Sequence, residues 1–228
     1  MWLAASGCWP ADHLDAWVSP RILDDVVPSL ARLAAGYFGA VALGLVIGIP
    51  IGLSRTLRNL VEPALEFLRA IPPPALVPIL ILFAGIGDAM KTLVIVSGCV
   101  WPVLLNTVEG VRGRDEVLED VVRCYRIGAL ARLWHFIIPS ASPQMFTGMR
   151  QALSIGIILM VISEMFAASN GLGFAIIQFE RSFAVPEMWT GIILLGLIGI
   201  VLAQAFHLVE RRALAWYHGL RQSQRAGG

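Results

Sequence analysis

The sequence predicts an all-α fold, a polytopic bundle of about five transmembrane helices. Hydrophobic residues make up 57% of the 228 residues and charged residues only 14%, whereas a soluble domain carries about 25% charged residues. The mean hydropathy is +0.74. The apolar residues gather in runs of about 20 residues, the length that crosses about 30 Å of hydrocarbon. Arginines cluster between alternate runs, as expected for a multi-pass membrane protein.

Five apolar runs are long enough to span a membrane: residues 33–53, 63–86, 92–111, 147–167 and 188–208. In the first run Gly44, Gly48 and Gly52 recur every four residues, so they share one helix face and favour the close approach of a second helix. The second run is interrupted by the sequence IPPP at 71–74. Prolines break a helix because they lack a backbone donor.

The placement of arginine predicts which ends of the spans face the cytoplasm. Three segments concentrate the basic residues: 54–62, 111–146 and 209–228. Cytoplasmic loops carry an excess of Lys and Arg, so the N-terminal segment and the 168–187 loop are extracytoplasmic. We therefore expect three parts: an extracytoplasmic segment at 1–30, a transmembrane region at 31–215 with a cytoplasmic loop at 111–146, and a cytoplasmic tail at 216–228.

The cytoplasmic segment 115–139 has the pattern of two short amphipathic helices. One apolar stripe is formed by residues spaced three and four apart: Leu118, Val122, Tyr125, Ala129 and Leu133. Such spacing is typical of one helix face. Gly128 is placed to bend the segment, and Pro139 to stop its second half. A solvated linker, or an amphipathic helix resting on anionic lipid, has the same pattern.

Polar residues within spans are costly and by default mark functional paths. Glu66 and Arg69 lie one turn apart just before Pro72, where they can pair or face an aqueous cleft. The alternative is a helix end on the cytoplasmic side with a snorkelling arginine. Asn106 and Glu109 lie near the inner end of the third span, and an interface role is the simpler interpretation for both.

The fourth span contains an acidic residue, Glu164, deep within the sequence VISEMFAAS. We expect it to act in a gate or in an interhelical hydrogen bond, and a neutral buried acid with no role in a path is the alternative. After this span, Gly171 and Gly173 suit a turn. The sequence FAIIQFERSF is then expected to form a short interfacial helix, or else a plain loop.

Patterns of catalysis and metal binding are missing from the sequence. It contains no GxxxxGK[ST] motif for binding ATP phosphates. Its four histidines are dispersed, and its three cysteines share no metal-ligand spacing. An intramembrane enzyme would need grouped catalytic residues, and a net charge of +1 gives no indication of nucleic-acid binding. We therefore expect no catalytic residue, metal site or cofactor in this chain.

Three stretches carry a family resemblance: LRAIPPPALVPILILFAGIGDAMK (68–91), WPVLLNTVEGVRGRDEVLED (101–120) and PSASPQMFTGMRQALSIGIILMVISEMFAASNGLGFAIIQFERSF (139–183). They resemble ABC importer permeases, the inner-membrane components of binding-protein-dependent transport systems, of the nitrate/sulfonate/taurine branch. The resemblance covers about residues 25 to 215. It implies a fold like that of ABC type I importers. Family members usually have six helices, so residues 1–30 are expected to hold the remnant of a truncated first helix.

The resemblance also identifies segment 115–139 as the loop that couples such permeases to an ATPase. The family motif reads Glu-Ala-Ala, three residues, Gly and, about a dozen residues later, Pro. With Pro139 on the motif's proline, Asp120 takes the glutamate position and Arg126 the glycine position. Because arginine lacks the freedom of glycine, Gly128 becomes the expected hinge. The residues expected to contact the ATPase are Asp120, Arg123, Tyr125, Arg126 and Gly128.

The function implied is that of a permease subunit in the bacterial inner membrane. The expected path and gate residues are Glu66, Arg69, Pro72, Asn106, Glu109 and Glu164. The expected partners are a second copy of this chain, two P-loop ATPase subunits that bind ATP and Mg²⁺, a periplasmic or lipoprotein substrate-binding protein and membrane lipid, but no nucleic acid. Small anions such as nitrate, sulfonates or taurine are the expected substrates. A vitamin precursor, or a channel or exporter of another class, is the alternative.

Overall fold

The computed structural model describes residues 20–114, 116–167 and 169–217, with the side chains of all but 20–23, 116, 123 and 167. These residues form helices and connecting turns, with no strand among them. The elements are α1 (Pro20–Leu53), α2 (Arg55–Arg69), the 3-10 turn η2 (Pro73–Leu76), α3 (Val77–Ala84), α4 (Asp88–Arg112), α5 (Glu116–Cys124), α6 (Ala129–Arg132), the π turn η3 (Leu133–Ile137), α7 (Ile138–Ala167), α8 (Leu172–Arg181) and α9 (Val185–Ala213).

The predicted spans are confirmed as helices. Four helical segments are long and apolar enough to cross a membrane: Asp24–Leu53, Asp88–Arg112, Ala129–Phe166 and Val185–Ala213. The fifth predicted span is a bent pair, Arg55–Arg69 and Pro73–Ala84, whose axes differ by 81°. The bend falls at the run of prolines, where the missing backbone donors interrupt the helix. Of residues 1–30, in which the remnant of a first helix is expected, 1–19 lie outside the described part of the chain.

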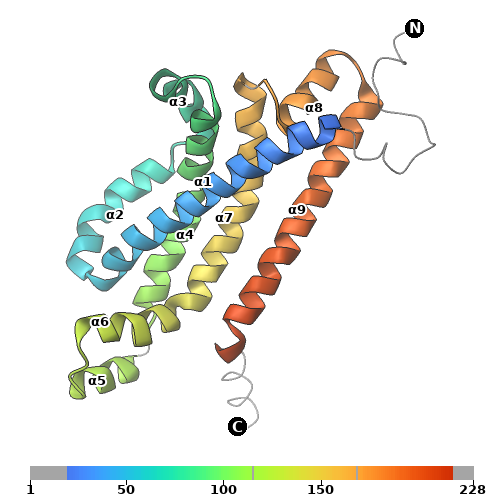
Figure 1. Ribbon diagram of the computed structural model, residues 1–228. Helices are drawn as coiled ribbons and strands as arrows, with labels where there is room; N and C mark the ends of the chain where they lie inside the picture. Colours follow the sequence, from blue (N-terminus) through green and yellow to red (C-terminus); the bar gives the residue numbers. More distant parts are fainter. Residues whose placement is uncertain (1–19, 115, 168, 218–228) are drawn as a thin grey trace.

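The core is built around α4, which packs between α1 and α7 (Figure 1). The predicted glycine face of α1 lies directly on α4. A Cβ atom at Gly44 would come within 2.7 Å of Val103, and one at Gly48 within 2.9 Å of Thr107. Real Cβ atoms do not approach so closely, so these two positions need glycine for the helices to pack at this distance.

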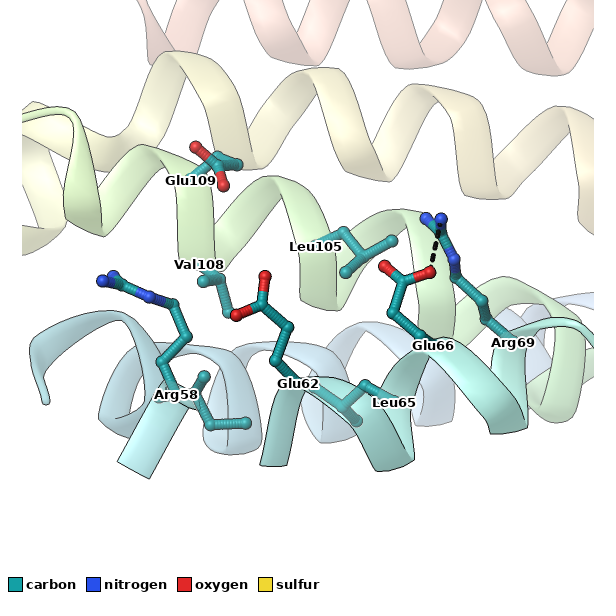
Figure 2. A pocket seen from close by; sticks show the side chains of 9 residues that line it. Arg58, Glu62, Leu65, Glu66, Arg69, Leu105, Val108 and Glu109 are labelled. Carbon is teal, nitrogen blue, oxygen red and sulfur yellow. Dashed lines mark ion pairs between the residues drawn. The ribbon is translucent and has the colours of Figure 1, made fainter. Parts of the chain in front are cut away.

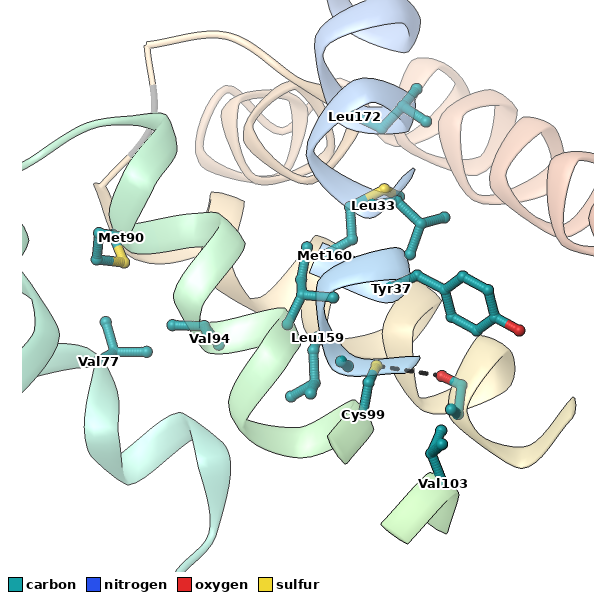
Figure 3. Packing of buried hydrophobic residues seen from close by; sticks show 13 residues of the cluster. Leu33, Tyr37, Val77, Met90, Val94, Cys99, Val103, Leu159, Met160 and Leu172 are labelled. Atoms are coloured by element: carbon teal, nitrogen blue, oxygen red, sulfur yellow. Dashed lines mark hydrogen bonds between the residues drawn. The ribbon is translucent and has the colours of Figure 1, made fainter. Parts of the chain in front are cut away.

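Buried apolar side chains from α1, α3, α4, α7 and α8 fill the space around α4 (Figure 3). Two hydrogen bonds cross this core: the Tyr37 hydroxyl donates to the Met149 carbonyl oxygen at 3.1 Å, and the Cys99 thiol donates to that of Ala152 at 3.2 Å. Both acceptors are backbone groups of α7. These bonds fix the positions of α1 and α4 against the same stretch of α7.

Helix α9 stands apart from this core and packs against α8 and α7 (Figure 1). No residue of its most apolar stretch is buried. Near its C-terminal end, the Glu210 carboxylate is buried and pairs with Arg150 of α7. The Arg150–Glu210 ion pair therefore holds the C-terminal end of α9 against α7.

The two ends of the bundle differ in composition. One end carries α5 and α6, the junction of α1 with α2, and the end of α9, whereas the other carries α8 and the connection between α3 and α4 (Figure 1). We name them the α5 end and the α8 end. The described parts of the arginine-rich segments, 54–62, 111–114, 116–146 and 209–217, lie at the α5 end. The positive-inside rule predicts that this end is cytoplasmic.

Candidate functional site

The corner between α5 and α6 turns at Arg126. This residue has φ +50°, in the left-handed region that only glycine adopts without strain. Gly128 has φ −59° and ψ 150°, which any residue adopts, and a Cβ atom there would meet nothing within 4 Å. Gly128 thus lies in the break between the two helices, as the extended residue before α6, whereas the left-handed turn is made at Arg126. The backbone turns at the position where the family motif has glycine, even though arginine occupies it here.

Pro139 does not stop the helix, in contrast to the prediction. The chain is helical without a break from Ala129 to Phe166. The π turn Leu133–Ile137 lies just before the proline, with the Ile138 N–H bonded to the Leu133 carbonyl oxygen, five residues back. A π turn widens the helix by one residue. The wider turn accommodates the proline ring, which would otherwise clash with the preceding turn.

The α5–α6 corner presents both apolar and charged side chains to its surroundings. Among the residues of the predicted stripe, Val122 is buried and Leu133 half-buried, whereas Leu118 and Tyr125 are exposed. Further exposed apolar side chains are those of Val117, Val121, Ile127, Leu130 and Trp134. Asp120 is exposed beside them. Arg123 lies in α5, but its side chain is outside the described part of the structure.

An ion-pair bridge holds this corner together. The Glu119 carboxylate pairs with Arg114, at the end of α4, at 3.3 Å, and with Arg132 of α6. Glu119 thus ties α5 to the elements on both of its sides. The corner therefore has a defined shape, which a docking surface needs and a plain linker does not.

Charged residues along α2 and near the C-terminal end of α4 line one pocket of about 260 Å³ (Figure 2). Its charged lining consists of Arg58, Glu62, Glu66, Arg69 and Glu109. An ion pair of 2.8 Å joins Glu66 to Arg69, as the spacing of one turn predicts. With three carboxylates and two guanidinium groups, this pocket has the polar lining that an aqueous path requires.

The remaining candidates for the path lie elsewhere. Asn106 is on the face of α4 that meets α7, where it donates to Gln151 at 3.2 Å and accepts from Gln144 at 2.8 Å. It therefore connects α4 to α7. Pro72 lies at the bend between α2 and η2, outside this pocket. Glu164 is far away, near the α8 end of α7.

Glu164 is 0% exposed, and both of its carboxylate oxygens accept hydrogen bonds. Oε1 accepts from the Ser29 hydroxyl at 2.7 Å and from Arg32 Nη1 at 2.8 Å. Oε2 accepts from the Gly173 N–H at 2.9 Å. Gly171 has φ +121°, and a Cβ atom there would lie 2.5 Å from the Glu164 carboxyl carbon. The turn predicted at Gly171 is thus shaped around this carboxylate.

Reasoning from the sequence did not identify the partner of Glu164, because Arg32 directly precedes the first apolar run, 33–53. The structure places it inside α1, where its guanidinium group also donates to Asp88 at 2.7 Å and to the Asn170 side chain at 2.6 Å. The available signal was the spacing of Asp25, Ser29 and Arg32, which puts all three on one helix face. Asp25 accepts from the Gly171 N–H at 2.9 Å, so this face holds the start of α8.

Residues 40–214 match the family described as the inner membrane component of binding-protein-dependent transport systems. The taurine transport system permease protein TauC of Escherichia coli is 31% identical over 208 residues, which are 91% of this chain and 74% of TauC. The putative aliphatic sulfonates transport permease protein SsuC of Bacillus subtilis is 32% identical over 188 residues, which are 82% of this chain and 68% of SsuC.

The fold is also similar to a solved structure. A chain of the MetNI methionine ABC transporter, in an inward-facing conformation, superposes with a TM-score of 0.68 over 84% of this chain and 95% of its own length, at 19% identity. The sequence match and the similarity in fold therefore indicate the same family. The chain therefore belongs to the family of inner-membrane components of binding-protein-dependent transport systems, as a multi-pass permease subunit of an ABC importer.

Proposed function

We propose that this permease imports small anions, with nitrate, sulfonates and taurine as the leading class, by docking a separate P-loop ATPase on its α5–α6 corner. Two of its relatives are named as permeases for taurine and for aliphatic sulfonates. The sequence contains no P-loop motif, so ATP and Mg²⁺ bind in the partner subunit. A homodimer of this chain, two ATPase subunits and one extracytoplasmic binding protein complete the proposed assembly, by analogy with the family.

The observation that carries the docking proposal is the surface of the α5–α6 corner. Its exposed apolar side chains, Val117, Tyr125, Leu130 and Trp134 among them, form a patch on a corner whose shape is held by the Glu119 bridge. Exposed apolar patches rimmed by polar residues mark interaction sites. Asp120 and Arg126 are exposed on the same corner and are suited to set the register of a partner.

The charged pocket between α2 and α4 is our candidate for the cytoplasmic part of the path. Its lining includes Glu66, Arg69 and Glu109, and it lies at the same end of the bundle as the docking corner. The corner is joined to the end of α4 through the Arg114–Glu119 ion pair, so a movement of the corner would be passed to the α4 wall of this pocket. Rigid-body shifts of this kind are a common means of coupling.

Co-purification tests the proposal directly. Leu130→Glu places a charge on the corner, where Leu130 is 71% exposed. We expect this variant to insert into the membrane but to lose its ATPase partner and its uptake. Leu60→Glu is the matched control, because Leu60 is 78% exposed in the arginine-rich 54–62 segment, away from the corner. Normal recovery of the ATPase with Leu130→Glu would refute the docking site, and the absence of any ATPase with the wild-type chain would refute the proposed function.

A further inference from the structure

One face of α7 is exposed along most of the helix and changes from polar to apolar halfway. Residues spaced three and four apart, from Ser140 to Met165, share this face. The half nearer the α5 end carries Ser140, Gln144, Thr147, Gln151 and Ser154, and the half nearer the α8 end carries Ile158, Ile162 and Met165. All of these side chains are exposed except Thr147 and Ile162, which are half-buried. We name the two halves the polar face and the apolar face of α7.

The polar face is only partly hydrogen-bonded within the chain. Asn106 of α4 donates to Gln151 and accepts from Gln144, which uses one polar atom of each glutamine side chain. Among the described residues, the other amide atom of each glutamine and the Ser154 hydroxyl have no hydrogen-bond partner. Ser154 lies about 10 Å inside the span predicted at 147–167. Polar groups without partners are costly at such a depth in hydrocarbon, so lipid does not fit the polar face.

Helix α9 presents a different surface at the same level of the bundle. Gly199 of α9 lies beside Ile157 of α7, because a Cβ atom at Gly199 would be 3.9 Å from Ile157 Cδ1. The exposed side chains around Gly199 are those of Leu197, Ile200 and Val201, and all three are apolar. Such a surface fits lipid. At the same level, the polar face of α7 needs water or a second protein surface.

The polar face adjoins the charged pocket. Helix α4 lies between α2 and α7 (Figure 2), and the two polar surfaces meet on it. A Cβ atom at Gly110 would lie 2.9 Å from the Gln144 Cβ atom, and the preceding residue, Glu109, is exposed and lines the charged pocket. Charged side chains at membrane depth face protein or a water-filled cavity. The same water can therefore fill the pocket and cover the polar face, which favours water over a second protein surface.

We propose that the polar face of α7 lines an aqueous vestibule that opens to the cytoplasm, and that the vestibule ends at Ile158, where the apolar face begins and forms the barrier to solute. The proposal rests on the proposed function and adds to it the wall of the path and the level at which the path is closed. Neutral amide and hydroxyl groups hydrogen-bond a solute without holding it by a full charge. Weak binding of this kind lets the solute leave again.

Ile158 is placed to start the barrier. It follows Ser154 on the same face, about 6 Å further along the helix, and its side chain is 58% exposed. Met165, further along this face, is exposed as well. Apolar constrictions stop polar solutes because water leaves them, so a row of exposed apolar side chains next to a wetted polar face has the order that a barrier requires.

Cysteine accessibility tests the vestibule in the assembled transporter. The native Cys8 and Cys124 are replaced by serine, and Cys99 is kept because it is buried. Single cysteines are then introduced into this background. Inside-out membrane vesicles that contain the permease and its ATPase are treated with a cationic, membrane-impermeant methanethiosulfonate. The reagent reports contact with water, because the thiolate is the reactive form of cysteine.

We expect Gln151→Cys and Ser154→Cys to be labelled at least about tenfold faster than Ile158→Cys. The matched control is Ile200→Cys on α9. Ile200 is 60% exposed, as exposed as Ile158, and its cysteine is expected to stay unlabelled because it faces lipid. Exposure alone therefore does not produce the expected pattern.

Each other outcome overturns part of the proposal. Labelling of Gln151→Cys and Ser154→Cys as slow as that of Ile200→Cys would overturn the vestibule; a disulfide between two copies of Gln151→Cys on oxidation would then assign the face to the second copy, and its absence would assign it to lipid. Labelling of Ile158→Cys as fast as that of Ser154→Cys would overturn the barrier at Ile158. Co-purification of the ATPase from the same membranes reports separately on the proposed function.

A variant of the barrier gives the second test. Ile158→Asn places a polar group at the start of the apolar face, so we expect trapped 2-aminoethanesulfonate to leak about tenfold faster from proteoliposomes without ATP. Ile200→Asn places the same group on α9 and is expected to leak at the wild-type rate. Equal leak rates for the two variants would contradict the barrier at Ile158.

Discussion

Replacing Glu164 by glutamine should destabilise the protein more than its modest change in size suggests. Both carboxylate oxygens accept hydrogen bonds, Oε1 from Ser29 and Arg32 and Oε2 from the Gly173 N–H. A glutamine has only one oxygen, so its amide nitrogen must face a donor in either orientation. The substitution also leaves the buried guanidinium group of Arg32 with one carboxylate in place of two.

The expected cost is about 3–5 kcal/mol in the free energy of unfolding, as found when one partner of a buried ion pair is removed. The matched control is Glu109→Gln. Glu109 pairs with Arg112 at 3.5 Å, and both side chains are 58% exposed, so this pair is worth about 0–1 kcal/mol. Denaturation of the purified protein in mixed detergent micelles measures both variants against the wild type.

A double variant separates loss of the pair from general damage. In Arg32→Met/Glu164→Met the two charges disappear together, and the cost is expected to be smaller than the sum of the two single substitutions. Additive costs would show that the two side chains do not stabilise each other. If Glu164→Gln lowers the free energy of unfolding by no more than about 1 kcal/mol beyond Glu109→Gln, the buried pair is worth no more than an exposed one. That result would refute the stabilising role assigned to Glu164.

Two further predictions concern backbone geometry. Gly44→Ala places a Cβ atom 2.7 Å from Val103 and is expected to lower the free energy of unfolding by about 1–3 kcal/mol. The control, Gly39→Ala, has its nearest neighbour at 3.5 Å and is expected to leave this free energy unchanged or to raise it by up to about 1 kcal/mol. Equal stabilities of the two variants in the same denaturation assay would contradict the close packing of α1 on α4. Arg126→Gly relieves the left-handed backbone and is expected to gain up to about 1 kcal/mol, whereas Gly128→Ala, at φ −59°, is expected to change the stability by less. A larger change in stability from Gly128→Ala than from Arg126→Gly, measured by thermal unfolding, would indicate that the strained turn lies at Gly128 and not at Arg126.

The spans could be predicted from the sequence because one physical requirement, crossing the hydrocarbon, acts on every residue of a run. The interrupted second span also followed from local chemistry, since adjacent prolines remove backbone donors wherever they occur. The close approach of a second helix to α1 was predicted in the same way, because Gly44, Gly48 and Gly52 share one helix face. In each case the signal lies within a single segment of the chain.

The features that were missed depend on contacts or strain that no single segment encodes. Arg126 adopts a backbone conformation that its own type disfavours, so composition pointed to Gly128 instead. Pro139 normally ends a helix, and only the π turn before it, which has no sequence signature of its own, lets α7 continue. The pairing of Arg32 with Glu164 joins residues 132 apart in the chain, and a periodic pattern does not report such a distance.

The continuous helix that begins at Ala129 connects the α5–α6 corner to Glu164. From Ala129 to Phe166 it contains 38 residues, a length of about 57 Å at 1.5 Å per residue. One end of this helix lies at α6, and the other carries Glu164, which accepts a hydrogen bond from the Gly173 N–H at the start of α8. Because α6 lies across the end of α7 (Figure 1), the straight arm is α7, whose 30 residues are about 45 Å long, and a tilt of about 10° displaces one of its ends by about 8 Å. Any movement of the corner that reaches the span along this helix has to pass through the five residues of the π turn, Leu133–Ile137.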